Sequence, residues 1–378
     1  MEKIWLSSPH MGGTEQKYVQ EAFDTNWIAP LGPHVNGFEA DLKSFLKNEQ
    51  KEIAVLSSGT AALHLGLIQL NVERDDVVLC QSITFSASAN PIVYLGAQPV
   101  FIDSEELTGN LCPIALEEAI VDSIQKGKKP KAIVAVHLYG MPYQVDEINA
   151  IANKYEIPIL EDSAESLGST YKGKHCGTFG TYGVLSFNGN KIITTSGGGA
   201  LVCPSKETKD KTVFLSTQAR DNAPHYQHSE IGYNYRMSNV CAGIGRGQME
   251  VLQAHIELRR AMHKFYVELF SKYNFVKVLQ EPNEDYYCNF WLSAIVVNHP
   301  TKEKTREGLR LHLEKYNIES RPLWKPMHMQ PIFENAPFYG DNVAEKLFEN
   351  GLCLPSGSNL NDHDRNRIKT AIEEYLEN

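Results

Sequence analysis

One lysine lies in an otherwise uncharged, β-prone stretch, GVLSFNGNKIITTSGGGALVC, which runs from Gly183 to Cys203. Its apolar ends predict a strand, a tight turn that carries Lys191, a short strand, a glycine loop and a closing strand. An amine held among glycines and small polar residues is partly withdrawn from water, which makes it a better nucleophile toward a carbonyl. We therefore expect Lys191 to form a Schiff base, and a solvated turn lysine is the alternative.

A carboxylate and an aromatic ring are the next candidates for a site around this lysine. Asp162 ends the apolar strand IPILED, where it would either cap the following turn or hold a proton on a heterocyclic nitrogen. Phe85, in SITFSASAN, offers a face on which a flat ring can stack, or it packs in the core. Further polar contacts are expected from Glu165, Ser166 and Ser186.

A phosphate seat is predicted where the strand EIAVLSS meets the helix SGTAALHLGLIQL. The first amides of a helix have no internal partners, and the helix dipole favours an anion beside them. Gly59 lets an anion approach the backbone, and Thr60 adds a hydroxyl group. An ordinary strand-to-helix turn without a ligand is the alternative.

The elements that must position these residues alternate between apolar strands and amphipathic helices. The strands EIAVL, DDVVLCQ, QPVFID, KAIVAVHLYG and IPILED are separated by helical patterns. This alternation predicts an α/β fold with a mostly parallel central sheet covered on both faces. Ligands bind at the carboxyl ends of the strands in such sheets. The candidates follow those ends: Ser57, Phe85, His137, Asp162 and Lys191.

The alternation fails from about Lys206, which predicts two domains. We expect a large α/β domain over residues 1–245, with an N-terminal helix and loop, and a small C-terminal α+β domain over residues 246–378. In the second part, 247–273 and 306–316 read as helices and FWLSAIVV as a strand. His225 and His228 lie in a polar loop without carboxylate partners, so no metal site is expected.

Composition excludes several classes of partner. The net charge of −10 argues against nucleic acid and anionic membrane surfaces, since both require basic patches. No apolar run approaches the roughly 20 residues of a membrane span, and the N-terminus lacks a signal-peptide core. The 7 cysteines form no CxxC pair, which indicates reduced thiols rather than disulfides or zinc. These features predict a cytoplasmic protein.

Six motifs occur in a characteristic order: SGTAAL, TFSASAN, HLYG, EDSAES, SFNGNKIITTSGGG and GYNYRMSN. Together they resemble the nucleotide-sugar aminotransferases of the DegT/DnrJ/EryC/StrS family over nearly the whole chain. The segments WIAPLG, STQARDN, RPLWKPMH and LCLPSG are most similar, within that family, to the transaminases of the N-acetylbacillosamine pathway, which act on a UDP-linked 4-keto sugar.

The resemblance implies a homodimeric aminotransferase of fold type I with pyridoxal 5′-phosphate as cofactor. By position, the resemblance implies that Lys191 is the lysine that forms the Schiff base, that Asp162 pairs with the pyridinium nitrogen and that Phe85 stacks on the ring. It further implies phosphate contacts from Gly59, Thr60 and Ser186, with Asn234 reaching the phosphate from the neighbouring subunit. Glu165 takes the position beside the phenolic oxygen, where many relatives carry glutamine or histidine.

The reaction implied by the resemblance moves an amino group from L-glutamate to C4 of a UDP-linked 4-keto-6-deoxy-N-acetylhexosamine. The candidates for binding the sugar nucleotide are Arg236, Arg321, Lys325 and His328. The alternatives are a GDP- or dTDP-linked keto sugar, or a non-catalytic regulator that binds the cofactor. A related sugar deoxygenase would carry histidine in place of Lys191. A nicotinamide-linked oxidoreductase would carry a GxGxxG motif after an early strand, and this sequence has none there.

Overall fold

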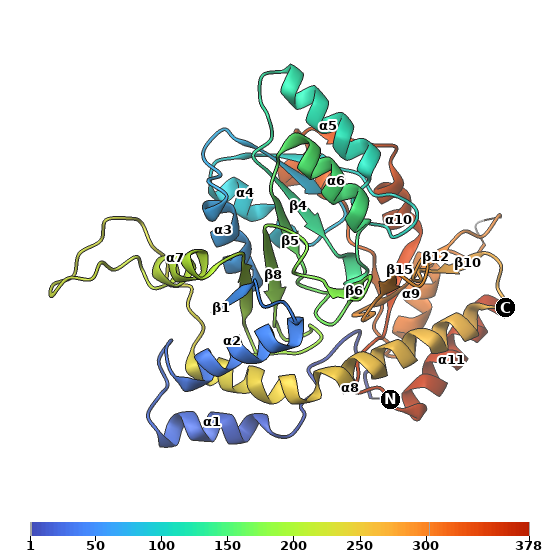
Figure 1. Ribbon diagram of the computed structural model, residues 1–378. Helices are drawn as coiled ribbons and strands as arrows, with labels where there is room; N and C mark the ends of the chain where they lie inside the picture. The colour runs from blue at the N-terminus through green and yellow to red at the C-terminus, as the bar shows by residue number, and fades with distance from the viewer. Residues whose placement is uncertain (1, 302, 378) are drawn as a thin grey trace.

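A mixed sheet of eight strands forms the centre of the computed structural model, which describes residues 2–301 and 303–377 (Figure 1). The strand order is β1-β9-β8-β5-β4-β2-β3-β14. Strands β8, β5, β4, β2, β3 and β14 pair in parallel, and β9 runs against both of its neighbours. The sheet consists of β1 (Glu52–Leu56), β2 (Val77–Gln81), β3 (Gln98–Ile102), β4 (Ala132–Val136), β5 (Ile159–Asp162), β8 (Tyr182–Ser186), β9 (Gly199–Cys203) and β14 (Phe338–Tyr339). The predicted α/β fold with a mostly parallel sheet is confirmed.

Helices cover both faces of this sheet because the strands present apolar side chains on each side. Val78 and Cys80 of β2 belong to one core cluster, and Val77 and Leu79 to another. The first face is covered by α3 (Gly59–Gln69) and α4 (Asn90–Tyr94), and α7 (Lys206–Ser216) packs beside α3. The second is covered by α5 (Pro113–Gln125), α6 (Val145–Tyr155) and α2 (Pro33–Leu46). Both faces are thereby sealed from water, as a parallel sheet requires.

The longest helix, α8 (Asn239–Phe270), joins the two parts of the molecule (Figure 1). Its first half packs on α1 (Glu15–Asp24) and α2, and its last turns pack on the small sheet. That sheet has the order β10-β12-β15-β13. The remaining small-domain elements are β10 (Val276–Val278), β12 (Ser293–Val297), α9 (Arg306–Lys315), β13 (Arg321–Pro322), α10 (Val343–Asn350), β15 (Gly351–Leu354) and α11 (Asp362–Glu377).

A third sheet and one property of the helices complete the description. Three short strands pair in the order β11-β6-β7, with β6 (Thr170–Tyr171), β7 (Lys174–His175) and β11 (Tyr286–Tyr287). Among the described residues, no helix combines the length and apolar character needed to cross a bilayer.

Three sequence-based expectations differ from the structure. The predicted domain boundary at residue 245 lies inside α8, and β14 from the C-terminal part pairs with β3 of the large sheet. Helix α8 begins at Asn239 rather than near 247. The short strand predicted after Lys191 is wrong: the amide of Thr195 donates to the carbonyl of Phe187 and that of Thr194 to Gln248 Oε1, so this segment folds as a loop.

Candidate active site

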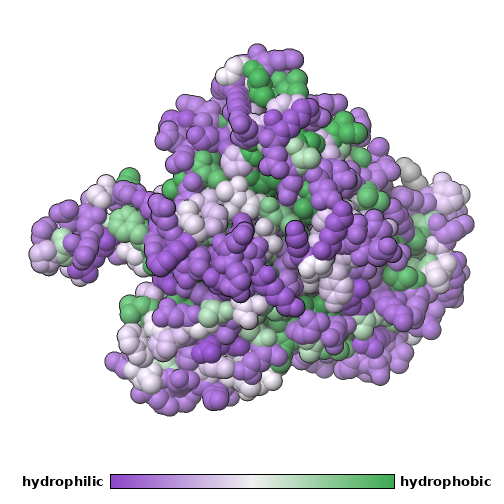
Figure 2. Space-filling model, in the orientation of Figure 1, coloured by the Kyte–Doolittle hydropathy of each residue, from purple (hydrophilic) through white to green (hydrophobic). Residues whose placement is uncertain are grey.

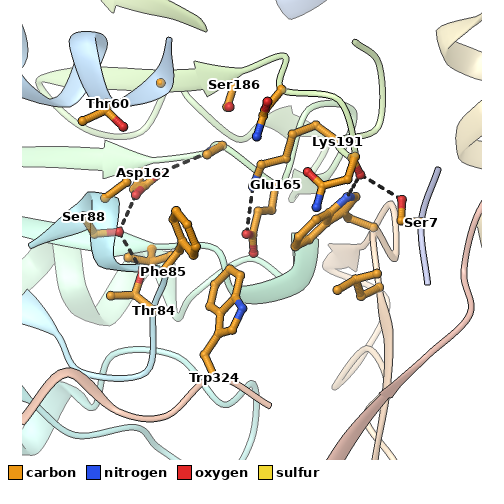
Figure 3. A pocket seen from close by; sticks show the side chains of 18 of the residues that line it. Ser7, Thr60, Thr84, Phe85, Ser88, Asp162, Glu165, Ser186, Lys191 and Trp324 are labelled. Carbon is orange, nitrogen blue, oxygen red and sulfur yellow. Dashed lines mark hydrogen bonds and ion pairs between the residues drawn. The ribbon is translucent and has the colours of Figure 1, made fainter. Parts of the chain in front are cut away.

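A cavity of about 600 Å³ opens at the carboxyl ends of the large-sheet strands (Figure 3). Its lining combines the sheet edge with the N-terminal segment and with residues of the small domain. Eight of the residues singled out from the sequence line this one cavity: Gly59, Thr60, Phe85, Asp162, Glu165, Ser186, Lys191 and Arg321. The cavity has the size of an ordinary small-molecule site.

Lys191 reaches into the cavity from the loop between β8 and β9, and its amine contacts a buried carboxylate (Figure 3). The Nζ atom lies 3.0 Å from Glu165 Oε1, and the exposed fractions of the two side chains are 12% and 4%. The same Nζ lies 4.3 Å from the centre of the Trp291 ring. The loop is held by Asn190, whose carbonyl accepts hydrogen bonds from Trp291 Nε1 at 2.7 Å and Ser7 Oγ at 2.8 Å. Lys191 is therefore withdrawn from water and fixed in direction.

Glu165 is a buried carboxyl group in the lining of this cavity. Burial raises the pKa of its carboxyl to about 7, although the charge of Lys191 and the hydrogen bonds from Lys191 and the Tyr139 amide act in the opposite direction. The negative charge of Asp162 adds to the rise. Glu165 can therefore take up or release a proton close to neutral pH.

Asp162 ends β5 at the floor of the cavity, and its carboxylate is held by a short chain of hydroxyl groups (Figure 3). Ser88 Oγ donates to Asp162 Oδ2 at 2.6 Å, and Thr84 Oγ1 lies 2.7 Å from Ser88 Oγ. The amide of Ala164 donates to the other carboxylate oxygen at 3.2 Å. These hydrogen bonds fix the position of the carboxylate at the floor of the cavity.

The N-terminus of α3 forms another part of the cavity wall. Ser58 caps the helix by accepting from the Ala61 amide, and Gly59 and Thr60 line the cavity. A Cβ atom on Gly199 would lie 2.4 Å from the backbone nitrogen of Gly59, so only glycine allows β9 to pass so close to this turn. The tight packing fixes the unpaired helix amides beside the hydroxyl of Ser186.

Phe85 and Trp324 form an aromatic wall of the cavity, and Tyr139 packs against Trp324. Phe85 is 57% exposed, and its ring centre lies 5.7 Å from that of Trp324. The ring of Tyr139 lies 5.0 Å from Trp324, and its hydroxyl accepts from the Trp324 amide. An aromatic ring left half-exposed in a cavity is available for stacking against a flat ligand.

The other sequence candidates lie elsewhere. Asn234 and Arg236 line a second cavity of about 710 Å³, and Arg236 is ion-paired with Glu39 at 2.7 Å. His328 contacts Ser82 Oγ and Glu345. Neither His328 nor Lys325 is part of the lining of the Lys191 cavity. His225 and His228 are in an exposed loop. The candidates that lie outside the Lys191 cavity are therefore polar side chains that find other partners in the fold.

Sequence reasoning missed residues brought in from distant segments. Trp5, Ser7, Ser88, Trp291 and Trp324 all line the cavity. Ser88 is 74 residues from Asp162 in the chain, and Trp291 is 101 residues from Asn190, so neither contact has a local sequence signal.

A buried cluster of His137, Glu161 and Cys176 lies next to this site and explains His137. Their ligand atoms all lie within 4.8 Å of one another. The Glu161 oxygens accept from the amides of Gly177 and Gly180 and from His137 Nε2, at 2.5, 2.9 and 2.7 Å. Burial acts to raise the pKa of Glu161, but these hydrogen bonds outweigh it and lower the pKa. Because both oxygens already accept hydrogen bonds, we assign the Glu161 carboxylate a structural role in holding the segment that contains Gly177 and Gly180 rather than a role as a metal ligand.

Comparison with known proteins gives a consistent result. The model of the DegT/DnrJ/EryC1/StrS aminotransferase family matches residues 9–373. A Bacillus subtilis protein named "Putative pyridoxal phosphate-dependent aminotransferase EpsN" is 48% identical over 371 residues, 97% of this chain and 94% of the relative. GDP-perosamine synthase of Escherichia coli O157:H7 is 35% identical, with 99% of both chains covered. A crystal structure of a DegT DnrJ EryC1 StrS aminotransferase from Brucella abortus superposes with a TM-score of 0.88 at 27% identity, covering 96% and 95% of the two chains.

Proposed function

The chain belongs to the DegT/DnrJ/EryC1/StrS aminotransferase family, a family dependent on pyridoxal 5′-phosphate, and we propose that it transfers an amino group to a sugar nucleotide. The donor is L-glutamate, and the acceptor is C4 of a UDP-linked 2-acetamido-2,6-dideoxy-4-keto-hexose. The product is UDP-4-amino-4,6-dideoxy-N-acetylglucosamine. The observation that carries the proposal is the meeting of Lys191, Asp162 and the N-terminus of α3 in one cavity.

The residues present fit the cofactor. The unpaired amides of α3, with Thr60 and Ser186, offer donors to a phosphate group, and Gly59 leaves no side chain in its way. Asp162 offers a carboxylate to the ring nitrogen, and Phe85 a free aromatic face to the ring. Lys191 offers the amine that binds the aldehyde carbon. These are the donor types that a phosphorylated pyridine aldehyde requires.

Each residue then has a distinct task in the reaction. Pyridoxal phosphate, when bound, would supply an electron sink for the substrate carbon that loses its proton. Asp162, fixed by Ser88, would hold a proton on the ring nitrogen. Lys191 Nζ would accept the proton from the substrate carbon and return it later in the reaction. Glu165, next to this amine, would lie beside the phenolic oxygen. The aromatic wall excludes water from the reacting atoms.

The choice of a UDP-linked acceptor rests on the sequence motifs that led to it. The relatives named GDP-perosamine synthase favour a second candidate, a GDP-linked keto sugar, at a lower identity. Arg321 lines the cavity and is the candidate that would contact the sugar nucleotide within the same chain. Arg236, Lys325 and His328 would do so only from a neighbouring subunit or after rearrangement.

A homodimer is the proposed assembly, with the cytoplasm, where thiols stay reduced, as its compartment. An arm, residues 218–233, projects from the body between α7 and α8 (Figures 1 and 2). Figure 2 shows it standing away from the rest of the surface with hydrophobic residues among hydrophilic ones. Asn234, at the base of this arm, is exposed and outside the Lys191 cavity of its own chain. This position supports a contact with the phosphate of the neighbouring subunit.

A substrate panel tests the proposal. The enzyme is incubated with L-glutamate and UDP-, GDP- or dTDP-linked 4-keto sugars, and the products are identified by mass spectrometry and NMR. We expect amination of the UDP-linked sugar and parallel steady-state lines, since the two substrates bind in turn. Lys191→Ala should abolish turnover, and Lys154→Ala, on the surface of α6, should not. Turnover by Lys191→Ala, or amination of none of the sugars, would refute the proposal.

A further inference from the structure

The N-terminal segment brings an exposed tryptophan to the mouth of the catalytic cavity. Ile4 forms a bridge with Ile318, with hydrogen bonds of 3.0 Å to the Asn317 carbonyl and 2.8 Å from the Glu319 amide. Ile4 is buried in the core of the small domain, whereas Trp5 is 51% exposed. The next residue, Trp5, lines the cavity together with Leu6 and Ser7.

Trp5 is only partly buried in the protein, with 51% of its surface exposed. The ammonium of Lys3 lies over one face of its ring, 3.7 Å from the ring centre. The residue lines the cavity that holds Lys191. A large apolar ring kept exposed at the entrance of a binding site is suited to stack on another flat ring.

Positive groups lie directly beside this indole. A small polar recess of about 190 Å³ adjoins the cavity and shares Glu319 and Arg321 with it; its lining also includes Lys3 and Arg310. Arg310 is engaged by Glu307 and Glu314. Arg321 is 67% exposed and donates to Glu319 through Nε and Nη2, and within residues 2–301 and 303–377 its Nη1 has no hydrogen-bond acceptor. Lys3 is exposed. The recess therefore presents donors to an anion at the edge of the stacking surface.

We propose that Trp5, Lys3 and Arg321 form the subsite for the nucleoside diphosphate half of the substrate. Trp5 stacks on the base, and Lys3 and Arg321 bind the diphosphate. The sugar is then directed past Trp324 toward Lys191, on the sheet side of the same cavity. This inference rests on the proposed function, because it assumes a sugar carried on a nucleotide.

Calorimetric titration of the cofactor-loaded enzyme with UDP, GDP and dTDP tests the subsite. We expect at least one of them to bind, Trp5→Ala to weaken that binding about tenfold, and Trp5→Phe to retain it within about threefold. Arg321→Ala should weaken it about tenfold and reduce its dependence on salt. Arg365→Ala, a charge-matched change on α11, should have no effect.

A second measurement separates this subsite from the reaction itself. The change in visible absorbance on adding glutamate needs no nucleotide, so it should be the same in the wild type and in Trp5→Ala. Its absence in the wild type would refute the proposed function. A normal glutamate response, combined with equal nucleotide affinity in Trp5→Ala and Arg321→Ala or with no nucleotide binding to the wild type, would overturn the subsite alone.

Discussion

Replacing Glu165 by glutamine should change how the stability of the apoprotein depends on pH. Burial raises the pKa of this carboxyl from 4.5 to about 7, so the folded protein keeps a proton that the unfolded chain has already lost. Between these values the folded state binds more protons, and the free energy of unfolding falls as pH rises. The ordinary conversion of ~1.4 kcal/mol per pKa unit gives a loss of about 2 to 3 kcal/mol between about pH 5 and 8.

Urea denaturation of the apoprotein at several pH values, at one protein concentration, measures this loss. Glu165→Gln has no proton to lose, so its stability minus that of the wild type should rise by about 2 to 3 kcal/mol from about pH 5 to 8. Glu118→Gln, on the exposed side of α5, is the matched control and should follow the wild type. Because Lys191 lowers the pKa of Glu165, Lys191→Met should move the same transition to higher pH.

A constant difference between Glu165→Gln and the wild type over this range would refute the reasoning. It would mean that Glu165 is already ionised at low pH and that the buried ion pair compensates its desolvation in full. Infrared titration of the carboxylic acid band, taken as the difference between the two proteins, gives an independent reading of the same proton.

Three further predictions follow from the packing around the site. Gly199→Ala should lower the free energy of unfolding by about 2 kcal/mol and weaken cofactor binding, because its Cβ would clash with the Gly59 backbone. Gly189→Ala is the control, since the nearest atom to its Cβ would be 4.0 Å away, and it should change neither quantity. Urea denaturation and cofactor titration measure the two effects. Asp162→Asn should reduce kcat on the order of 100-fold or more and Ser88→Ala about tenfold, and equal effects in steady-state kinetics would argue against a supporting role of Ser88. Glu161→Gln should lower the free energy of unfolding by about 3 kcal/mol, measured in urea, because an amide nitrogen would then face backbone N–H donors. An unchanged denaturation midpoint would contradict the structural role of Glu161.

The sequence was sufficient for the large sheet because its signals are local. Each apolar strand is followed by polar or glycine residues, and the parallel arrangement carries all those strand ends to one edge. The meeting of Lys191 with Asp162 could therefore be predicted. The start of α8 could not, because Gly243, Gly245 and Gly247 read as helix breakers. In the fold they let α8 approach α1 and α2 so closely that a Cβ on Gly245 would lie 2.7 Å from the ring of Phe38.

The candidates for binding the sugar nucleotide were harder to predict for a different reason. Arg236 and His328 belong to motifs as distinctive as that of Arg321, but a charged side chain takes whichever partner the tertiary structure brings close. Arg236 meets Glu39, which is 197 residues away in the chain. Trp5 reaches the cavity only because Ile4 pairs with Ile318. Neither contact leaves a trace in the local pattern of the sequence.

Helix α8 has a consequence for how this enzyme closes around a substrate. Its 32 residues extend for roughly 48 Å and belong to the cores of both domains. Near its middle, the buried Arg259 donates to the carbonyls of Trp291 and Ser356 and to Ser7. A hinge between the domains would have to bend this continuous helix and break those bonds. We therefore expect the two parts of the molecule that α8 joins to move as one rigid body, and access to Lys191 to depend on short segments around the cavity rather than on closure of one part over the other.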